Sequence, residues 1–427
     1  MKTYINPDEN NWEVLCERTQ IEKNQLENTV SAILSEVSEK GDKALLDFSE
    51  RFDKVLLEKL QVSNEEIKEA ISLVADDLKE AIQLAKRNIE VFHTAQKSEE
   101  NVVETTKGVK CWRKSLPIDK VGLYIPGGSA PLFSTILMLG VPAKIAGCKE
   151  IILCTPPSKD GTVHPAILYT ASLVGVTKIF KVGGAQAIGA MTYGTETIPA
   201  TYKIFGPGNQ FVTKAKELIQ QQGVAIDMPA GPSEVLVIAD ETCNVSFVAS
   251  DLLSQAEHGA DSQAILVSDS EKVVTEVLKE VASQLEALPR KGIAKLALEN
   301  SRAIVLDSAD ACINFSNQYA PEHLIIASEN SEYFIPNITN AGSVFLGNYS
   351  CESAGDYASG TNHTLPTYGF AKNYSGVSLD SFVKKVTFQK LSKEGIQNIG
   401  NAIELMAEAE GLHAHKNAVT LRLESLK

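Results

Sequence analysis

The sequence lacks the usual signs of a disulfide-stabilised or membrane-spanning protein. Its seven cysteines are scattered and include no Cys-x-x-Cys pair, so we interpret them as reduced thiols rather than a disulfide framework or thiolate zinc site. The most apolar stretch, residues 132–143, is interrupted by Gly140 and Pro142 and is too short to span a bilayer. The first nine residues have no apolar signal-peptide core, so we expect a cytoplasmic protein.

Basic residues are in the minority. The chain has 40 Lys and Arg against 54 Asp and Glu, which gives a formal net charge of −14. Contacts with nucleic-acid phosphates or anionic lipids need a basic surface, so we expect neither nucleic acid nor membrane as a partner. A small cationic substrate would suit this charge, although charge alone is a weak indication.

What is present is a long chain with alternating patterns. At 427 residues it exceeds the size that a single hydrophobic core usually supports, so at least two domains are expected. Residues 26–52 and 64–92 carry apolar side chains at helical spacing. From Lys120 onward, short β-branched runs alternate with helical stretches, which is typical of βαβ units. The expected strands are residues 121–125, 151–154, 179–182, 202–205, 235–239, 264–267, 303–306, 324–326 and 344–346.

These patterns predict an α/β fold with two doubly wound, Rossmann-like parallel-sheet domains, one inserted in the other. We expect a main domain from residues 23–123 and 233–375, which would carry the site. Residues 124–232, bounded by Gly/Pro turns, would form the inserted domain. Residues 1–22 and 376–427 are expected to be small helical segments at the two ends.

A polar pair closes one predicted helix. Apolar spacing from Phe247 and a terminating Gly259 place Gln255 and His258 near the helix end, three residues apart and on one face. An imidazole beside an amide oxygen can bind a metal ion. A capping histidine beside a solvated glutamine explains the same residues, and this segment alone favours that explanation.

A second polar pair stands where a loop enters a strand. Pro321 fixes a turn, and Glu322 and His323 follow it directly. The ends of parallel strands are where the sites of α/β proteins assemble. A carboxylate and an imidazole side by side can supply a base and a water activator. A helix-terminal glutamate and an edge histidine fit the segment equally well.

Two further segments are unusually polar. Residues 355–363 are rich in glycine and small polar side chains, and we interpret them as a binding loop in which Asp356 is a candidate ligand supported by His363. A purely structural loop is the competing interpretation. Near the C-terminus, Glu410 and His415 lie in a polar connection between helices. We interpret this connection as part of a site only if the other three polar segments require a further ligand.

Three glycine-rich turns follow expected strands and precede expected helices, at residues 124–128, 183–186 and 206–209. Helix N-termini reached through glycine bind phosphate groups with their backbone N–H groups. None of the turns has the Gly-x-Gly-x-x-Gly spacing with an acidic residue about twenty positions on. On these segments alone, tight βα turns of any α/β fold are therefore a better explanation than a dinucleotide site.

Taken together, these segments resemble the histidinol dehydrogenase family. Several long, uncommon strings in one order are far more specific than any single motif, and here they extend over nearly the whole chain. The matching stretches are residues 121–128, 206–209, 231–234, 255–263, 320–323, 340–366 and 410–417.

The resemblance implies a site assembled from distant segments. It implies one zinc ion per subunit, bound by Gln255, His258, Asp356 and His415, and it implies that Glu322 and His323 are the acid–base pair. The substrate would contact Ser233, Gln255, His258, His323, Asp356, Glu410 and His415. NAD would bind in the inserted domain, residues 124–232, at Tyr124, Gln186 and Asn209.

The resemblance also implies the reaction, which is oxidation of L-histidinol through L-histidinal to L-histidine with two NAD⁺, the last step of histidine biosynthesis. It implies a homodimer with shared active sites, in which residues 376–427 reach the neighbouring subunit. Glu410 and His415 would then act across the dimer. The choice of His415 rather than His413 as ligand depends on the sequence register.

The chemistry assigns different roles to the acid–base pair. A neutral imidazole suits removal of the hydroxyl proton, which is the expected role of His323. Glu322 would activate the water that adds to the aldehyde. Two alternatives remain open: a zinc hydrolase that uses the same cluster, and a non-catalytic metal-dependent binding protein. The absence of His-Glu-x-x-His is mild evidence against the hydrolase, and the presence of both Glu322 and His323 disfavours the binding protein.

Overall fold

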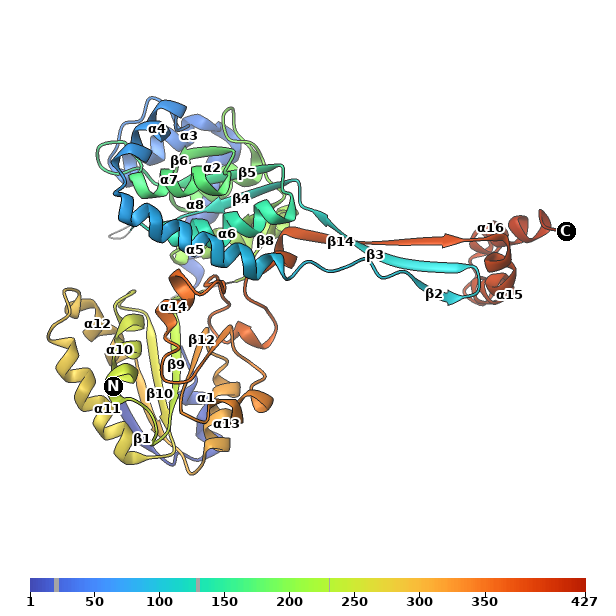
Figure 1. Cartoon of the computed structure of the whole chain (residues 1–427). Helices are drawn as coiled ribbons and strands as arrows, with labels where there is room; N and C mark the ends of the chain where they lie inside the picture. Colours follow the sequence, from blue (N-terminus) through green and yellow to red (C-terminus); the bar gives the residue numbers. More distant parts are fainter. Residues whose placement is uncertain (19–22, 128–130, 230) are drawn as a thin grey trace.

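The computed structural model describes residues 1–18, 23–127, 131–229 and 231–427. Figure 1 shows two α/β domains, one above the other, and a narrow arm that projects sideways from the upper one. Within the described residues, no helix is both long and apolar enough to cross a membrane. Gly128 of the first glycine-rich turn and the expected boundary at residue 22 lie outside these residues.

The lower domain of Figure 1 contains a six-stranded parallel sheet in the order β1-β11-β10-β9-β12-β13. Alternate residues enter two apolar layers, because Val235 and Val237 pack with α10, α11 and α12, whereas Leu236 and Ile238 pack with α1 and α13. Its strands are β1 (Lys2–Ile5), β9 (Glu234–Ala239), β10 (Gln263–Ser268), β11 (Arg302–Val305), β12 (His323–Ala327) and β13 (Ser343–Leu346). Its helices are α1 (Trp12–Leu15), α10 (Val245–Ala256), α11 (Glu271–Leu285), α12 (Lys291–Glu299), α13 (Ala309–Tyr319) and α14 (Glu352–Tyr357).

The upper domain contains a five-stranded parallel sheet in the order β6-β5-β4-β7-β8. Helices α2, α3, α8 and α9 cover one face, and α4 to α7 cover the other. Its strands are β4 (Lys120–Tyr124), β5 (Glu150–Thr155), β6 (Lys178–Lys181), β7 (Lys203–Phe205) and β8 (Ala225–Ile226). Its helices are α2 (Lys23–Lys40), α3 (Asp42–Phe48), α4 (Asn64–Leu73), α5 (Asp76–Thr94), α6 (Phe133–Ala146), α7 (Pro165–Val174), α8 (Gly184–Tyr193) and α9 (Gln210–Ile219).

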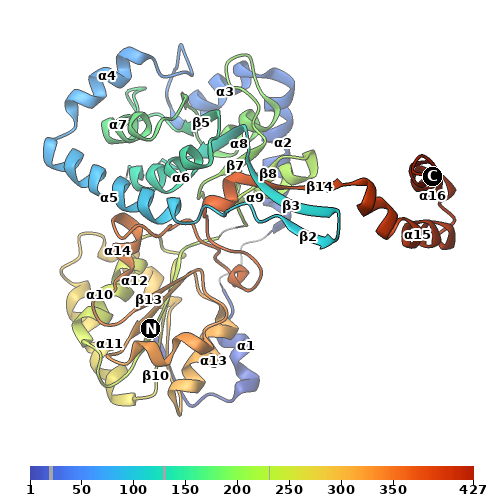
Figure 2. The ribbon, with the colours of Figure 1, turned by 45° about the vertical axis from the view of Figure 1, so that its right-hand side comes forward.

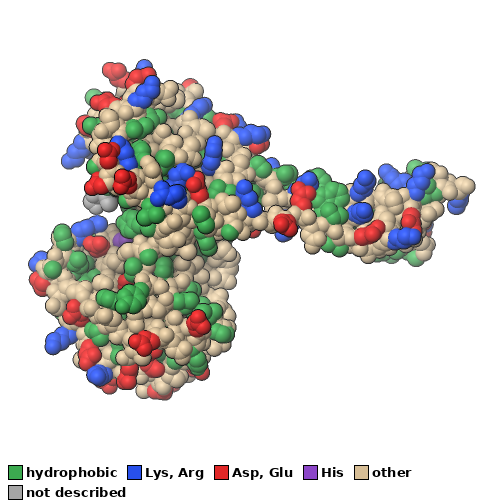
Figure 3. Space-filling model, in the orientation of Figure 1, with side chains coloured by type: hydrophobic (Ala, Val, Ile, Leu, Met, Phe, Trp, Pro, Cys, Tyr) green, Lys and Arg blue, Asp and Glu red, His purple; other side chains and the backbone are tan. Residues whose placement is uncertain are grey.

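The arm is an antiparallel ribbon in the order β14-β3-β2, which ends in α15 and α16 (Figures 1 and 2). Trp112 and Phe388 stack across it with ring centroids 5.5 Å apart. Figure 3 shows hydrophobic side chains gathered on one face of the arm. The elements are β2 (Val103–Thr106), β3 (Val109–Pro117), β14 (Val383–Leu391), α15 (Lys393–Ala409) and α16 (His413–Glu424).

The α/β class, the two parallel sheets and the insertion of one domain in the other are confirmed, but the division of the chain differs from expectation. Residues 23–94 pack on the five-stranded sheet, so the insertion begins before residue 124. The first residues add strand β1 and helix α1 to the six-stranded sheet, and the tail begins with strand β14. Amphipathic spacing shows that a helix buries one face but does not show on which sheet.

The turn after β7 approaches the end of β4 very closely. Gly206 has a φ of +127°, and a Cβ there would lie 2.0 Å from the Tyr124 carbonyl oxygen. Its backbone N–H donates to Asp227 Oδ2 at 2.8 Å, and its carbonyl accepts from Lys216 Nζ at 2.9 Å. Lys216 and Asp227 are themselves a buried ion pair. This position therefore requires glycine for both space and backbone conformation.

We predict that Gly206→Ala lowers the free energy of unfolding by about 3 kcal/mol, because a strained φ and a backbone clash combine. Urea unfolding measures the loss. Gly223→Ala is the matched control, since Gly223 has a φ of +86° with nothing within 4 Å of its Cβ position. The control should lose only about 1 kcal/mol. Equal losses in the two variants would contradict the close approach at Gly206.

Candidate active site

The expected acid–base pair lies where two neighbouring parallel strands begin. Strand β12 begins at His323, which pairs in register with Val235 of β9, and Glu322 and Ser233 stand just before the two strands. The strand ends therefore gather these residues at the amino edge of the six-stranded sheet. Ligands of open α/β sheets usually bind at the carboxyl edge.

His323 is buried in one defined orientation. Its Nδ1 lies 3.1 Å from the Glu234 carbonyl oxygen. Because a carbonyl only accepts, Nδ1 carries the proton and Nε2 presents a lone pair. Nε2 has no hydrogen-bond partner among the described residues and lies 3.8 Å from Asp356 Oδ1. Burial lowers the pKa of His323 to about 3, so the ring is neutral and can accept a proton at Nε2.

Glu322 is also buried and is held by the same residue. Its Oε2 accepts the Glu234 backbone N–H at 2.8 Å and lies 3.7 Å from His323 Nδ1. Burial raises the pKa of Glu322 well above its usual value, and the carboxylates of Glu234 and Asp356 raise it further. A carboxyl group with a raised pKa is suited to proton exchange near neutral pH.

A possible metal site lies beside this pair. One ligand atom each from His258, Glu352 and Asp356 lies within 4.8 Å of the other two. Glu352 and Asp356 are four residues apart on α14, so they share a face of this helix. The expected loop at residues 355–363 therefore begins inside a helix. Burial raises the pKa of Asp356 to about 7.

The donors of this group fit a divalent cation. Glu352 is buried with both carboxylate oxygens unpartnered among the described residues, and Gln255 is buried with both amide atoms unpartnered. Buried polar atoms without partners are costly unless something binds them. Imidazole, carboxylate and amide oxygen are donors that zinc accepts. His258 is exposed, so the group opens toward solvent.

A chain of hydrogen bonds links this group to the other domain. His363 Nδ1 lies 3.0 Å from the Asp356 backbone oxygen, and its Nε2 lies 3.2 Å from Thr135 Oγ1 at the start of α6. Nearby, Asn362 Nδ2 donates to the Met138 carbonyl at 2.6 Å. Because α6 follows strand β4, these contacts bring the carboxyl edge of the five-stranded sheet next to the metal site.

The expected NAD residues all lie at this carboxyl edge. Tyr124 ends β4, and its buried hydroxyl accepts the Gly184 backbone N–H at 3.0 Å. Asn209 caps α9 by accepting from the Phe211 and Val212 backbones. Gln186 is buried in the first turn of α8. The edge is the usual one for a nucleotide, and contact with NAD stays a prediction.

The last two expected residues are not brought to this site within one chain. Glu410 ends α15 and His415 lies in α16, and both side chains are exposed. Figures 1 and 2 show these helices at the far end of the arm, away from α14. Their participation would need a second copy of the chain.

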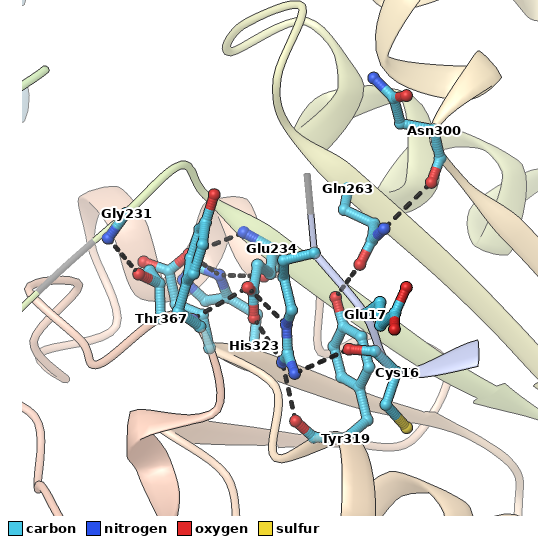
Figure 4. A network of polar contacts seen from close by, with 12 residues as sticks. Cys16, Glu17, Gly231, Glu234, Gln263, Asn300, Tyr319, His323 and Thr367 are labelled. Atoms are coloured by element: carbon cyan, nitrogen blue, oxygen red, sulfur yellow. Dashed lines mark hydrogen bonds and ion pairs between the residues drawn. The ribbon is translucent and has the colours of Figure 1, made fainter. Parts of the chain in front are cut away.

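Sequence reasoning missed three residues of the site. Glu352 could have been found, because it stands one helical turn before Asp356. Glu234 follows Ser233 in the matching stretch 231–234, but nothing in the sequence indicates that its carboxylate is buried beside the site. Arg18 forms an ion pair with Glu234 at 3.0 Å across 216 residues, and no local pattern indicates it (Figure 4).

Comparisons with known proteins agree on one family. A family model described as histidinol dehydrogenase matches residues 16–423. The chain belongs to the histidinol dehydrogenase family. A histidinol dehydrogenase of Bacteroides thetaiotaomicron is 58% identical over 427 residues, covering 100% of both chains. One of Campylobacter jejuni subsp. jejuni serotype O:2 is 53% identical, covering 99% of both.

A solved structure supports the same family. The crystal structure of histidinol dehydrogenase from Elizabethkingia anophelis has a TM-score of 0.98 and 62% identity to this chain. It covers 100% of this chain, and this chain covers 98% of that one. The family consists of oxidoreductases of histidine biosynthesis, so the resemblance drawn from the sequence motifs is confirmed.

We predict that His258→Asn abolishes stoichiometric zinc binding, because it removes the only imidazole of the three-residue group. Elemental analysis and zinc-dependent thermal shift measure this, since a ligand that binds only the native state raises Tm. His164→Asn is the control, because His164 caps α7 through Nδ1 and asparagine also caps helices well. Unchanged zinc content in His258→Asn would contradict the proposed ligand.

Proposed function

We propose that this protein is a zinc-dependent histidinol dehydrogenase that oxidises L-histidinol to L-histidine through L-histidinal, with two NAD⁺ consumed in sequence. One observation carries the proposal. The neutral imidazole of His323, whose Nε2 has no partner among the described residues, lies 3.8 Å from Asp356, which shares a possible metal site with His258 and the buried, unpartnered Glu352, in a chain of this family. The cytoplasm is the proposed location.

Gln255, His258 and Asp356 would hold the zinc ion, together with His415 of the partner subunit. When bound, zinc supplies a positive centre that orients the imidazole and amine nitrogens of the substrate. Ser233 at the start of β9 and Glu410 of the partner subunit would contact the same substrate. Glu352, which shares the group with His258 and Asp356, would offset the positive charge.

The first oxidation needs a base for the hydroxyl proton. His323 is suited to this role, because its Nδ1–H is fixed on the Glu234 carbonyl and its Nε2 is unprotonated. As the proton moves to Nε2, a hydride would leave the carbinol carbon, and NAD⁺, when bound, would supply the hydride acceptor. Tyr124, Gln186 and Asn209 are the proposed contacts of the dinucleotide at the facing sheet edge.

The second oxidation needs water. Glu322 would take one proton from a water molecule as the water oxygen bonds to the aldehyde carbon. His323 would return the proton from the first step to the carbonyl oxygen, which gives a hydrated aldehyde and a neutral imidazole. His323 would then take a hydroxyl proton while a second hydride leaves, and the carboxylic acid remains. Burial of both side chains limits competing reactions with bulk water.

The arm supports a homodimer with shared sites. Val102 and Val103 near β2, and Leu405, Met406 and Leu421 in the terminal helices, are large exposed apolar residues. Apolar surface of this kind marks an interface when it is contiguous. Because Glu410 and His415 lie at the end of the same arm, a partner's arm would carry them to a site that lacks its fourth ligand.

Metal removal tests the function directly. We predict that the purified protein forms two NADH per L-histidinol, measured at 340 nm, and that chelation abolishes the activity until zinc is restored. Elemental analysis before and after chelation is the parallel measurement. The hydrolase alternative predicts no NADH, and NADH formation unaffected by complete zinc removal would refute the zinc dependence.

We predict that Glu322→Gln slows oxidation of L-histidinal much more than oxidation of L-histidinol to the aldehyde, because only the second step activates water. A loss of about a hundredfold or more in the second step is expected. Single-turnover NADH formation from each substrate separates the steps. Glu329→Gln, an exposed glutamate seven residues on, is the control. Equal slowing of both steps would contradict the division of roles.

A further inference from the structure

A buried ion pair between Arg18 and Glu234 adjoins the acid–base pair, because the Glu234 backbone contacts both Glu322 and His323. Figure 4 shows the polar network around Glu234 and His323. Arg18 Nε and Nη2 each donate to one carboxylate oxygen of Glu234 at 3.0 Å. Glu234 Oε1 also accepts the Tyr368 backbone N–H at 2.9 Å. The Glu234 side chain is 1% exposed, so its charge depends on these contacts. Two parallel hydrogen bonds fix the direction of the carboxylate as well as its position.

Arg18 is held firmly on its other side. Its Nη2 donates to the Tyr319 carbonyl at 2.7 Å, and its Nη1 donates to the Cys16 carbonyl at 3.2 Å. The guanidinium lies 3.8 Å above the centre of the Tyr319 ring, whose hydroxyl donates to Gln263 Oε1 at 2.7 Å. Tyr319 is the last residue of α13 and precedes Glu322 by three residues.

Arg18 therefore joins the entrances of two strands. Glu234, which accepts from Arg18 through its carboxylate, is the first residue of β9. Tyr319, which accepts through its backbone carbonyl, directly precedes the short turn that leads into β12. Ala320 in that turn has a φ of +54°, a strained conformation for a residue with a side chain. Such a conformation persists only where the surrounding contacts enforce it.

The Glu234 backbone connects this network to the two catalytic candidates, Glu322 and His323. Its N–H donates to Glu322 Oε2 at 2.8 Å, and its carbonyl lies 3.1 Å from His323 Nδ1. Both catalytic candidates thus take their orientation from one peptide segment, whose own side chain is locked by Arg18.

We propose that Arg18 and Glu234 are positioning residues for the oxidation proposed above, on which this inference rests. The ion pair holds the Glu234 backbone so that its carbonyl keeps the proton of His323 on Nδ1 and its N–H directs Glu322. A buried ion pair contributes little net stability compared with apolar residues of similar size. Its contribution here is directional, like that of residues that orient metal-binding histidines.

The test removes the pair as a unit. In the double variant Arg18→Leu, Glu234→Gln, no unpaired charge is left buried, and the amide oxygen still accepts from Tyr368. We expect kcat for L-histidinol to fall about tenfold to a hundredfold, while KM and zinc content change by less than about twofold. Arg18→Lys keeps the positive charge but loses the planar pair of hydrogen bonds, so its kcat should lie between those of the unmodified protein and the double variant. If the double variant does not fold, Arg18→Lys tests the positioning role instead, through the same measurements of kcat, KM and zinc content.

A second readout does not depend on turnover. Ring ¹⁵N chemical shifts of His323, assigned with His323→Gln, should show a proton on Nδ1 alone in the unmodified protein and a mixture of tautomers in the double variant. Arg302→Gln is the matched control. Arg302 donates to the carbonyl of Glu17, the neighbour of Arg18, and within the described part of the chain it makes no hydrogen bond to Glu234. It should leave kcat and the tautomer unchanged.

The outcomes separate the two proposals. A folded double variant with unchanged kcat and an unchanged tautomer overturns the positioning role while histidinol oxidation stands. A loss of kcat that only matches the loss of folded protein or of zinc also overturns it. If the unmodified protein forms no NADH from histidinol, the proposed function fails and this inference fails with it.

Discussion

One peptide segment at the start of β9 holds Glu322 and His323, the proposed acid–base pair, in place. The Glu234 N–H holds Glu322, and the Glu234 carbonyl orients His323, because β9 and β12 run in parallel register with Val235 opposite His323. A shift of one residue in that register would turn the imidazole to the other face of the sheet. The positions of Glu322 and His323 therefore depend on the alignment of β9 and β12. The residues that form these hydrogen bonds are 88 and 89 positions apart in sequence.

Burial determines the chemistry of these groups. Desolvation keeps His323 neutral, and it raises the pKa values of Glu322, Glu352 and Asp356. The buried Glu352 carboxyl, whose two oxygens have no partner among the described residues, is stabilised when a cation lies beside it. The same burial that keeps the imidazole neutral thus favours a metal ion beside it.

The two domains contribute opposite sheet edges to one region. The six-stranded sheet contributes its amino edge with Glu322 and His323, and the five-stranded sheet contributes its carboxyl edge with the glycine-rich turns. His363, which contacts both Asp356 and Thr135, joins them. This arrangement places His323 and the sheet edge that carries the expected NAD contacts on the two sides of one region, which suits the proposed hydride transfer.

The sequence by itself predicted the α/β class and the central strands of both parallel sheets, because β-branched runs and helix spacing are local properties, but it did not predict β1, β2, β3, β8 or β14. It also predicted His258, Asp356, Glu322 and His323 as site residues through residue type and family resemblance, and the structure brings these four side chains close together. Only the tertiary structure decided that residues 23–94 pack on the five-stranded sheet, that the tail begins with strand β14, and that Arg18 reaches Glu234. These features arise from contacts between distant segments, and an amphipathic face or a lone arginine does not encode which partner it will meet.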